Sequence, residues 1–238
     1  MNGQSPPVVF SVHAERALFT RPDLRVERFT YPVPTFGALA GVLRSVYAKP
    51  SFYWVPRRVL IMKPIRYQNI LVNEVKSLAI KKHPFVAPDR RMQKMQTYLY
   101  DVEYVVEAWF EWSGKQPEDQ DLTKHMCIFD RSLEVGGRRD VFLGTRECTT
   151  VVEPLNKEIT SKPARERFDA VVEDWLRDHS GLNLDVGIMF YGWEWGTGMD
   201  QTDTPMFFSA EVRDGILEYP HPSDKDRVIR QQFDRREE

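Results

Sequence analysis

The hydrophobic pattern of the first fifty residues predicts a strand followed by a helix. The segment VVFSVHAERALF (8–19) alternates in part and is rich in β-branched residues, as strands are. In TFGALAGVLRSVYA (35–48), apolar side chains recur every three or four residues, which predicts an amphipathic helix with Thr35 as its N-cap. Pro50 marks the predicted end of this helix, because proline cannot continue it.

The middle of the chain predicts strands around a charged loop, and then a second helix. Residues 51–72 combine aromatic and β-branched residues with two prolines, which predicts strand material with bends. KKHPFVAPDRRMQKMQ (81–96) is charged and lacks periodicity, so we expect an exposed loop or hairpin tip there. TYLYDVEYVVEAWFEW (97–112) alternates clearly and predicts a strand. LTKHMCIFDRSLEV (122–135) has apolar residues at helical spacing and ends at a glycine pair, a common helix stop.

The last third of the chain predicts mostly strands with one further helix. ARERFDAVVEDWLRD (164–178) places Phe168, Val171, Val172 and Trp175 on one helical face. Later segments are β-rich, and Asp214-Gly215 is a two-residue hairpin turn signal. The order of elements up to about residue 150 predicts an α+β fold with two helices on one face of an antiparallel sheet, as in ferredoxin-like or RRM-like folds.

Composition adds a charge asymmetry to this picture. The 238 residues are enough for one large domain or two small ones, and the total charge is only -2. Residues 57–96, however, contain ten Lys or Arg and two acidic residues, a local charge of +8. Such a basic segment in an acidic remainder indicates contact with a polyanion, although a merely solvated basic loop is the alternative.

The cysteines and the amino terminus bear on the compartment. Cys127 and Cys148 have no ligand-spaced neighbours, so we expect both to be buried, reduced side chains and expect no structural zinc. No signal-peptide pattern and no run of eighteen apolar residues occurs, which predicts a soluble cytoplasmic protein without membrane contact.

His125 is the histidine whose neighbours suggest chemistry. It follows Lys124 on the second predicted helix, and a histidine can move a proton near pH 7 while an ammonium stabilises a developing oxyanion. RNA cleavage by its own 2'-hydroxyl needs these two functions and no metal. A surface Lys-His pair without a role is the alternative. The sequence contains no HExxH, no phosphate-binding GxxxxGK[ST] and no GxSxG, and we expect neither metal nor cofactor.

Two further features suggest contact with RNA. Seven aromatic residues lie on or beside the basic segment, and strand alternation leaves two or three of them free to stack on bases. They are Phe52, Tyr53, Trp54, Tyr67, Tyr98, Tyr100 and Tyr104. The block VGGRRDVFLGTREC (135–148) is either a helix stop followed by a strand or a glycine-arginine cradle for a phosphate backbone. The two interpretations are compatible.

Four segments resemble the CRISPR-associated Cas-five family, of the subtype I-C (Dvulg) kind. They are YPVPTFGALAGVLRSVYAKP, IMKPIRYQNI, TKHMCIFDRSLEVGGRRDVFLGTREC and DGILEYP. The resemblance implies a ferredoxin-like domain (1–150) with a basic hairpin at about 66–98. It also implies a smaller antiparallel β subdomain (151–238), in which the helix at about 164–178 is an insertion.

The resemblance also implies a function and the residues that carry it. The I-C kind cuts precursor CRISPR RNA at the base of the repeat stem-loop and stays on the 5' handle within the Cascade complex. Its cleavage triad falls on Tyr47, Lys124 and His125. The expected partners are CRISPR RNA and the backbone and large subunits of Cascade, with a target DNA contact left open. The expected RNA-binding residues are Gly136, Gly137, Arg138, Arg139, Arg146, Lys81, Lys82, Arg90 and Arg91.

Three functions remain in competition from the sequence. The first is a metal-independent endoribonuclease that leaves a 2',3'-cyclic phosphate and a 5'-hydroxyl. The second is a non-catalytic subunit that only binds the 5' handle. The third is a duplex-DNA-binding protein, because phosphate contacts alone do not distinguish the two polymers. Whether Tyr47 or His125 acts as base or acid also stays open.

Overall fold

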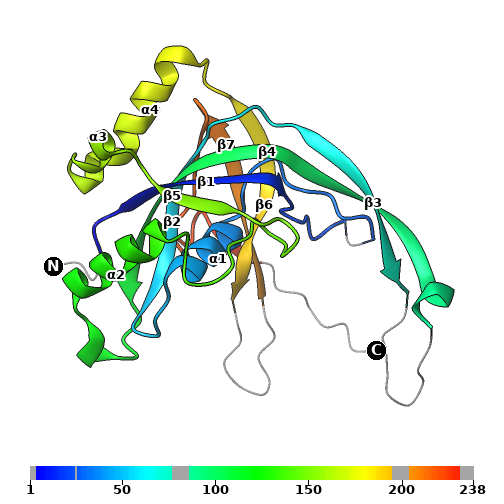
Figure 1. Ribbon diagram of the computed structural model, residues 1–238, viewed down its shortest axis with the longest axis horizontal. Helices are drawn as coiled ribbons and strands as arrows, with labels where there is room; N and C mark the ends of the chain where they lie inside the picture. Colours follow the sequence, from blue (N-terminus) through cyan, green and yellow to red (C-terminus); the bar gives the residue numbers. More distant parts are fainter. Residues whose placement is uncertain (1–3, 25, 77–85, 195–203, 231–238) are drawn as a thin grey trace.

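A computed structural model describes residues 4–24, 26–76, 86–194 and 204–230 of the chain. The strands form one large antiparallel sheet, and the helices pack against it (Figure 1). The α-helices are α1 (Phe36–Val46), α2 (Leu122–Glu134), α3 (Lys157–Thr160) and α4 (Arg167–Asp178). Short 3-10 helices are η1 (Ala87–Arg90), η2 (Pro117–Asp119) and η3 (Ala164–Glu166). The strands are β1 (Val8–Ala17), β2 (Phe52–Ile61), β3 (Tyr67–Val75), β4 (Arg91–Trp112), β5 (Val151–Pro154), β6 (Leu184–Glu194), β7 (Thr204–Arg213), β8 (Ile216–Glu218) and β9 (Ile229–Arg230).

The sheet runs without a break from the first part of the chain into the second. Its strand order is β5-β1-β4-β2-β8-β7-β6, with β3 paired to β4 and β9 paired to β7. The junction is the pairing of β2 with β8, in which Val59 lies opposite Leu217. The turn between β7 and β8 is the predicted Asp214-Gly215 pair, and both residues have positive φ, as a tight hairpin turn requires.

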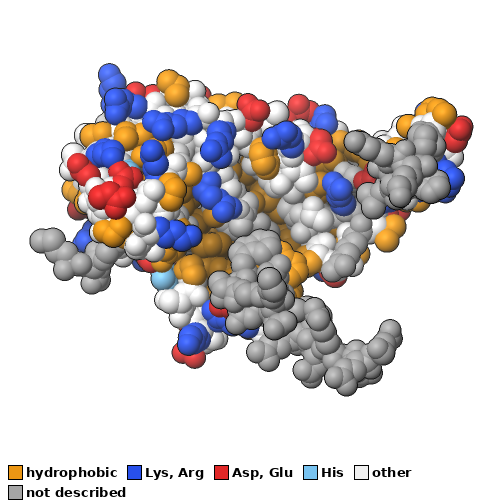
Figure 2. Space-filling model, turned by 90° about the horizontal axis from the view of Figure 1, so that it is seen from below, with side chains coloured by type: hydrophobic (Ala, Val, Ile, Leu, Met, Phe, Trp, Pro, Cys, Tyr) orange, Lys and Arg blue, Asp and Glu red, His pale blue; other side chains and the backbone are white. Residues whose placement is uncertain are grey.

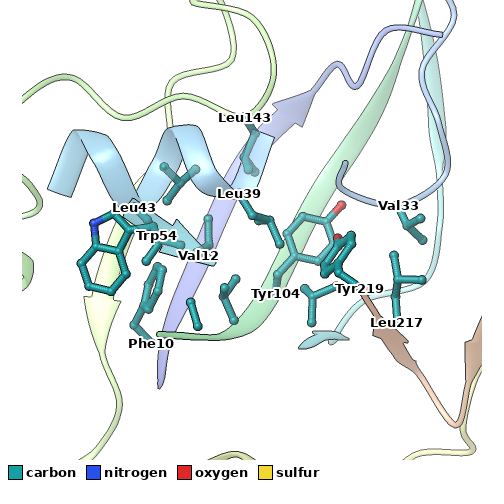
Figure 3. Close-up of a cluster of buried hydrophobic side chains, with 14 of the residues drawn as sticks. Phe10, Val12, Val33, Leu39, Leu43, Trp54, Tyr104, Leu143, Leu217 and Tyr219 are labelled. Atoms are coloured by element: carbon teal, nitrogen blue, oxygen red, sulfur yellow. The ribbon is translucent and has the colours of Figure 1, made fainter. Parts of the chain in front are cut away.

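Helices cover both faces of the sheet. Helices α1 and α2 lie on one face and α4 lies on the other (Figure 1). On the α1 face, Phe10, Leu43 and Trp54 are buried in the main core (Figure 3). On the other face, Phe168 of α4 packs with Leu60 and Val105 of the sheet. The predicted helical face of α4 is therefore confirmed as a packing face.

The long strand β4 extends past the sheet and forms an arm with β3. Residues 91–96, the last part of the segment expected to be an exposed loop or hairpin tip (81–96), are strand, because each has a register partner in β3, from Val75 opposite Arg91 to Ile70 opposite Gln96. Residues 81–85, the start of that segment, lie outside the described residues. At the base of the arm, Asp101 accepts hydrogen bonds from Lys63 at 2.8 Å and from Arg66 at 2.5 Å.

Both long helices of the α1 face begin with a side-chain N-cap, and that of α1 is the predicted Thr35. The Thr35 hydroxyl accepts a hydrogen bond from the Ala38 amide, and the Asp121 carboxylate accepts one from the Lys124 amide. Such caps satisfy backbone donors that have no partner inside the helix. In the described part of the chain, no helix is long and apolar enough to cross a membrane.

Candidate active site

Tyr47 lies directly after α1 and is buried, with 1% of its surface exposed. Its amide donates a hydrogen bond to the Leu43 carbonyl at 2.9 Å, which continues the helical pattern by one residue. Its carbonyl accepts a hydrogen bond from the Trp54 indole at 2.6 Å. These bonds fix the backbone of Tyr47 to both α1 and β2, so the phenol side chain has a defined direction.

His125 lies in the first turn of α2 and is fully buried. Its ring lies among the rings of Tyr47, Phe52, Phe110 and Trp112, at centroid distances between 5.1 and 6.2 Å. The alternative of a surface Lys-His pair is therefore wrong for this histidine, because its imidazole faces the core.

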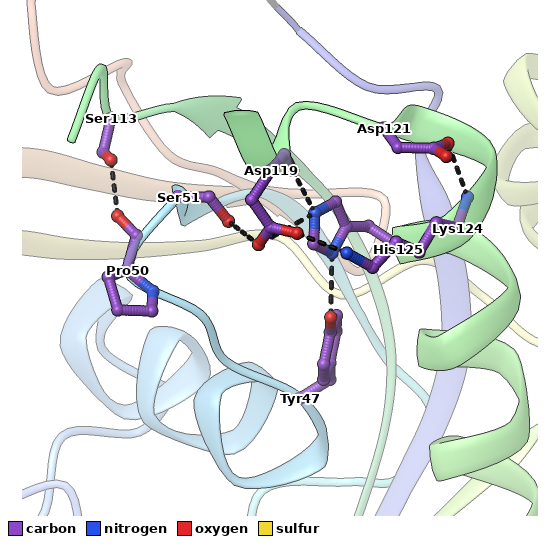
Figure 4. Close-up of polar contacts among 8 residues, drawn as sticks. All are labelled: Tyr47, Pro50, Ser51, Ser113, Asp119, Asp121, Lys124 and His125. Carbon is purple, nitrogen blue, oxygen red and sulfur yellow. Dashed lines mark hydrogen bonds and ion pairs between the residues drawn. The ribbon is translucent and has the colours of Figure 1, made fainter. Parts of the chain in front are cut away.

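Two hydrogen bonds determine the tautomer of His125. Its Nε2 lies 2.6 Å from the main-chain oxygen of Asp119, and its Nδ1 lies 2.8 Å from the Tyr47 hydroxyl (Figure 4). A carbonyl oxygen can only accept, so Nε2 carries the proton. In the neutral imidazole, Nδ1 is then an acceptor and the Tyr47 hydroxyl donates to it. The pair is thus arranged for a proton to pass from tyrosine to histidine.

Lys124 and Asp119 form the polar rim of this pair. The Lys124 ammonium donates to the Asp119 carboxylate, and about half of the Lys124 side chain is exposed (Figure 4). The same carboxylate accepts a hydrogen bond from Ser51 at 3.0 Å and lies 3.5 Å from Nε2 of His125. Lys124 and His125 are consecutive, yet one side chain faces solvent and the other faces the core, because successive helical residues point about 100° apart.

Burial and charge shift the pKa values of this group. Burial raises the pKa of the Tyr47 phenol, while the nearby Arg138 guanidinium opposes this increase. The hydrogen bond to Asp119 raises the pKa of Lys124, and the bond from Lys124 lowers the pKa of the Asp119 carboxyl. At neutral pH, Tyr47 is therefore a neutral donor and Lys124 a stable cation.

The glycine pair closes α2 as the sequence predicted. Gly136 and Gly137 have φ values of 80° and 104°, a region that favours glycine. The Gly137 amide donates to the Ser132 carbonyl at 2.8 Å and the Gly136 amide donates to the Leu133 carbonyl at 2.9 Å. These two bonds are those of a Schellman motif, a frequent helix ending.

The arginines that follow are docked onto the end of α1. The amides of Arg138 and Arg139 both donate to the Ser45 carbonyl at 3.1 Å. The segment after α2 is therefore hydrogen-bonded to the end of α1. The Arg138 guanidinium lies over the Tyr47 ring, 4.8 Å from its centroid. Thus the glycine-arginine block lies beside the Tyr47–His125 pair.

A surface pocket of about 510 Å³ brings the predicted phosphate-binding residues together. Its lining includes Gly136, Gly137, Arg138, Arg139 and Arg146. All three arginines are exposed, and none makes an ion pair with another residue of the described chain. The strand expected after this block is only a bridge between Phe142 and Thr149, because the chain turns at Gly144 against the Leu18 carbonyl.

Of the other predicted RNA-binding residues, those that the structure describes, Arg90 and Arg91, lie far from this pocket. Arg90 and Arg91 are exposed at the outer end of the arm, and in Figure 1 the arm and α2 lie at opposite ends of the long axis of the molecule. Lys81 and Lys82 lie outside the described residues. Figure 2 shows Lys and Arg side chains spread over the face between these two ends.

Exposure limits which aromatic residues could stack on bases, and the stacking itself stays a prediction. Of the seven aromatic residues near the basic segment, Tyr53, Tyr67 and Tyr100 are exposed and the other four are buried. Cys148 is buried as expected. The prediction for Cys127 is wrong: it is exposed, because the core-facing side of α2 is occupied by His125 and Phe129.

Sequence reasoning missed Asp119, which contacts Ser51, Lys124 and His125. It lies in η2, a short turn without periodicity, and its partner Ser51 is 68 residues away in the chain. The only local signal is the acidic run PEDQD directly before α2. That run is equally typical of a solvated loop, so it could not identify the residue.

Comparisons with known proteins bear on the family. The sequence model of the family described as "CRISPR-associated protein (Cas_Cas5)", Cas_Cas5d, matches residues 8–220. A relative from Mannheimia succiniciproducens, named "CRISPR pre-crRNA endoribonuclease Cas5d", is 30% identical and aligns over 88% of this chain and 92% of its own length. A relative of the same name from Thermus thermophilus is 32% identical, over 88% of this chain and 89% of its own length.

Solved structures agree. A functionally uncharacterized protein from Streptococcus mutans has a TM-score of 0.68 and 27% identity, covering 96% of this chain and all of that one. A structure described as a CRISPR-associated protein has a TM-score of 0.68 and 28% identity, over 96% and 99% of the two chains. These matches confirm the resemblance inferred from the sequence. The chain belongs to the Cas5 family of CRISPR-associated proteins, subtype I-C.

Proposed function

We propose that this protein is a metal-independent endoribonuclease that cuts precursor CRISPR RNA at the base of the repeat stem-loop. Two relatives that match nearly the whole chain are named for this activity. One observation carries the proposal for this chain: Tyr47, Lys124 and His125 belong to a single hydrogen-bonded cluster. Tyr47 follows α1 and lies 78 residues before His125 of α2.

The first chemical step is attack of a 2'-hydroxyl oxygen on the adjacent phosphorus. In our proposal the 2'-hydroxyl proton passes to the Tyr47 oxygen while the phenol proton passes to Nδ1 of His125. Such a relay suits the observed hydrogen-bond direction, and it removes the need for a free phenolate, which the raised pKa of Tyr47 disfavours. The Asp119 carboxylate, 3.5 Å from Nε2, stabilises the imidazolium that results.

The second step is departure of the 5'-oxygen. The bond between phosphorus and the 5'-oxygen breaks, and the 5'-oxygen takes a proton from water at the exposed rim. The hydroxide that results is neutralised by the proton that the His125 imidazolium releases, so the pair returns to its starting state. The products are a 2',3'-cyclic phosphate and a 5'-hydroxyl. The Lys124 ammonium, released from Asp119 to the phosphate, neutralises charge on the phosphorane. No step in this scheme requires a metal ion.

The burial of Tyr47 and His125 sets a condition on this mechanism. Because both rings are almost fully buried, bound RNA has to move a covering side chain to reach the phenol. Lys124 and Arg138 are the cationic side chains beside the pair, and a phosphate is the group that would draw both outward.

The same burial favours a second candidate function. A fully buried histidine with two hydrogen bonds among aromatic rings is also what a purely structural core residue looks like. In that case the protein holds the 5' handle of the guide RNA and does not cut. The pocket at Arg138, Arg139 and Arg146 serves either function.

We include the expected domains and partners in this proposal. We propose that residues 1–150 form a ferredoxin-like domain. The order β1-β4-β2 with α1 and α2 on one face supports this, and β5 (Val151–Pro154), which pairs with β1, lies just past the proposed boundary. We propose 151–238 as a smaller β subdomain, although its strands continue the same sheet. The protein would stay on the 5' handle as a Cascade subunit, with Arg90 and Arg91 on the arm available for RNA, other subunits or target DNA.

One experiment tests cleavage itself. Purified protein is incubated in EDTA with the CRISPR repeat RNA of its own locus, and with a copy that carries a single 2'-deoxy substitution at the cut site. We expect cutting of the first RNA and none of the second, because the 2'-oxygen is the nucleophile. If neither RNA is cut but both bind, the handle-binding function replaces the nuclease. Cutting of both RNAs would rule out the 2'-hydroxyl mechanism.

A further inference from the structure

A second pocket, of about 1000 Å³, is lined in part by Trp112, whose ring packs against that of His125. Its other lining residues come from the interior strands β2 and β4, the amino-terminal segment, the start of α2 and η3. Its lining combines large aromatic side chains with arginines: Arg57, Trp109, Trp112, Gln120, Leu122 and Arg165. We propose that this pocket binds a single-stranded segment of the RNA next to the cleavage site. The inference rests on the proposed function and adds a substrate subsite to it.

The chemistry of the lining fits unpaired nucleotides. Indole rings and guanidinium planes are the surfaces on which splayed bases stack, and arginines also pair with phosphates. The Arg57 guanidinium lies over the Trp109 ring, 5.6 Å from its centroid. The Trp109 indole N–H donates to Glu111 at 2.9 Å, which holds the ring edge in place, while Arg57 lies over one face of the ring. The volume is at the upper end of the usual range for ligand pockets, about 300–1,000 Å³.

The negative charge in the pocket is already compensated. Glu107 contributes to the lining but is only 1% exposed, and Arg58 donates two hydrogen bonds to it, at 2.6 and 3.0 Å. Arg57 is 3.9 Å from the same carboxylate and its side chain is half exposed. Arg165 makes no ion pair with any described residue. Two cationic groups therefore stay available for phosphates.

Its position connects this pocket to the proposed catalytic centre. The Trp112 ring packs against the His125 ring, 5.7 Å between centroids, and also lines the pocket. Gln120 and Leu122 of the lining lie between Asp119 and Lys124 in the chain. The arginine pocket at Gly136–Arg146 lies at the opposite end of α2, about 20 Å away at 1.5 Å per residue. RNA held at both ends of α2 would pass Lys124 between them.

The test compares charge reversals in the pocket with a matched reversal outside it. Fluorescein-labelled repeat RNA is titrated at several salt concentrations with two proteins. One is the double variant Arg57→Glu with Arg165→Glu, and the other is the control Arg177→Glu, at the exposed end of α4. We expect the double variant to bind at least about tenfold more weakly and to lose about 1.4 from the salt slope, since two phosphate contacts are removed. The control should bind as the wild type does.

A second measurement needs no variant and covers the case in which the double variant fails to fold. Repeat RNAs that carry 5-iodouridine at single positions beside the cut site are crosslinked to the wild-type protein, and the attachment site is mapped by mass spectrometry. Crosslinks at Trp109 or Trp112 support the pocket. Crosslinks only elsewhere overturn it.

The outcomes separate this inference from the proposed function. If the wild type cuts the repeat RNA and the folded double variant binds it with unchanged affinity and salt slope, the pocket is not an RNA site. If that variant binds RNA normally but no longer associates with other Cascade subunits, the pocket takes a protein, and the inference is wrong. If the wild type neither binds nor cuts, the proposed function fails first and the subsite fails with it.

Discussion

His125 is held where a change of protonation has large consequences. Aromatic rings surround its imidazole, both ring nitrogens are hydrogen-bonded, and no part of the side chain contacts water. A proton gained there places a charge in an apolar surrounding, which is costly unless an anion is close. The Asp119 carboxylate is that anion, and Lys124 holds it in place. The chemistry of His125 therefore depends on a residue outside the expected triad.

The bond between Asp119 and Lys124 leads to a prediction for Lys124. Replacing Asp119 with Asn removes the hydrogen bond and charge that raise the pKa of the Lys124 ammonium, so this pKa should fall toward its ordinary value. A larger fraction of Lys124 is then unprotonated at a given pH, and its acylation by a pulse of acetic anhydride should become faster. Peptide mass spectrometry measures the rate, with Lys157 of α3 as an internal reference. An unchanged rate for Lys124 would contradict the assigned bond.

Tyr47→Phe should destabilise the protein by about 1–3 kcal/mol. The substitution keeps the ring but leaves Nδ1 of the buried His125 without a donor, and an unsatisfied buried acceptor costs about this much. Urea denaturation of the wild type and the variant measures the difference. Tyr53→Phe is the matched control, because its hydroxyl is bonded at an exposed position. A loss no larger than that of the control would show that the buried hydrogen bond does not form.

At the scale of elements, the ends of α1 and α2 position the site together. The glycine pair ends α2 and sends the chain back onto the Ser45 carbonyl of α1, which fixes the helices next to each other. Arg138 is placed over Tyr47 by the same turn. The sequence allowed this block to be a helix stop, a phosphate cradle or both. In the structure it ends helix α2, and the lining of its pocket suits phosphate binding.

Gly137→Ala should disturb this junction more than an ordinary glycine substitution. A Cβ at Gly137 would sit 3.1 Å from the Val141 side chain and 3.3 Å from the Arg139 carbonyl, at a φ of 104°. We expect a stability loss of about 1–3 kcal/mol and weaker RNA binding. Gly41→Ala in α1 is the control, because its Cβ meets nothing within 4 Å and alanine favours helix. The two melting temperatures should move in opposite directions; equal shifts would argue against strain at the turn.

What the sequence could predict follows from how local each signal is. Helix α2 is encoded by nearby residues, so its span and its glycine stop were within reach of pattern analysis. The inward direction of His125 was not, because the spacing of α2 permits either Lys124 or His125 to face the core. Asp119 is held by Ser51, 68 residues away, a contact that depends on the packing of distant segments. The same holds for the pairing of β2 with β8, which joins the two halves of the sheet.

At the scale of the molecule, the carboxyl-terminal segment is tied to the sheet next to the site. Glu111 near the end of β4 accepts hydrogen bonds from Tyr53 of β2 at 2.7 Å and from the Trp109 indole at 2.9 Å. Its Oε1 also lies 2.8 Å from Nε2 of His221, which follows β8. Burial alone would raise the pKa of Glu111, but these bonds outweigh it and lower the pKa. The Glu111 carboxylate thus links β2 and β4 to the segment that follows β8.

This carboxylate predicts a pH dependence of the folding stability. A group whose pKa is lower in the folded state contributes stability above its unfolded pKa, near 4.5, and loses it as pH falls through the folded value. Glu111→Gln should therefore destabilise the protein at pH 7 by about 1 kcal/mol, a figure reduced for partial solvent exposure. The difference should shrink below about pH 4. Denaturation at a series of pH values measures it, and a difference that is independent of pH would contradict the assignment.

The whole arrangement suits one long substrate. Arginines lie at one end of α2, an aromatic and arginine pocket lies at the other end, and the arm reaches to the far end of the molecule. Between the two pockets is the Tyr47–His125 pair with its Lys124 and Asp119 rim. In this account the pockets supply the binding energy and the pair supplies the chemistry, so changes in the pair should affect the rate and not the affinity.

The most direct test of the proposed role of His125 compares the wild type with His125→Gln. The quantity measured is the single-turnover rate of repeat RNA cleavage in EDTA at saturating protein. Glutamine retains hydrogen-bonding groups in the buried site but cannot take up a proton near pH 7. The account predicts a rate at least about a hundredfold lower, as is typical when an acid-base group is lost, with an unchanged RNA dissociation constant. His179→Gln, an exposed histidine at the end of α4, should cut as the wild type does. A His125→Gln protein that cuts within twofold of the wild-type rate would contradict the account.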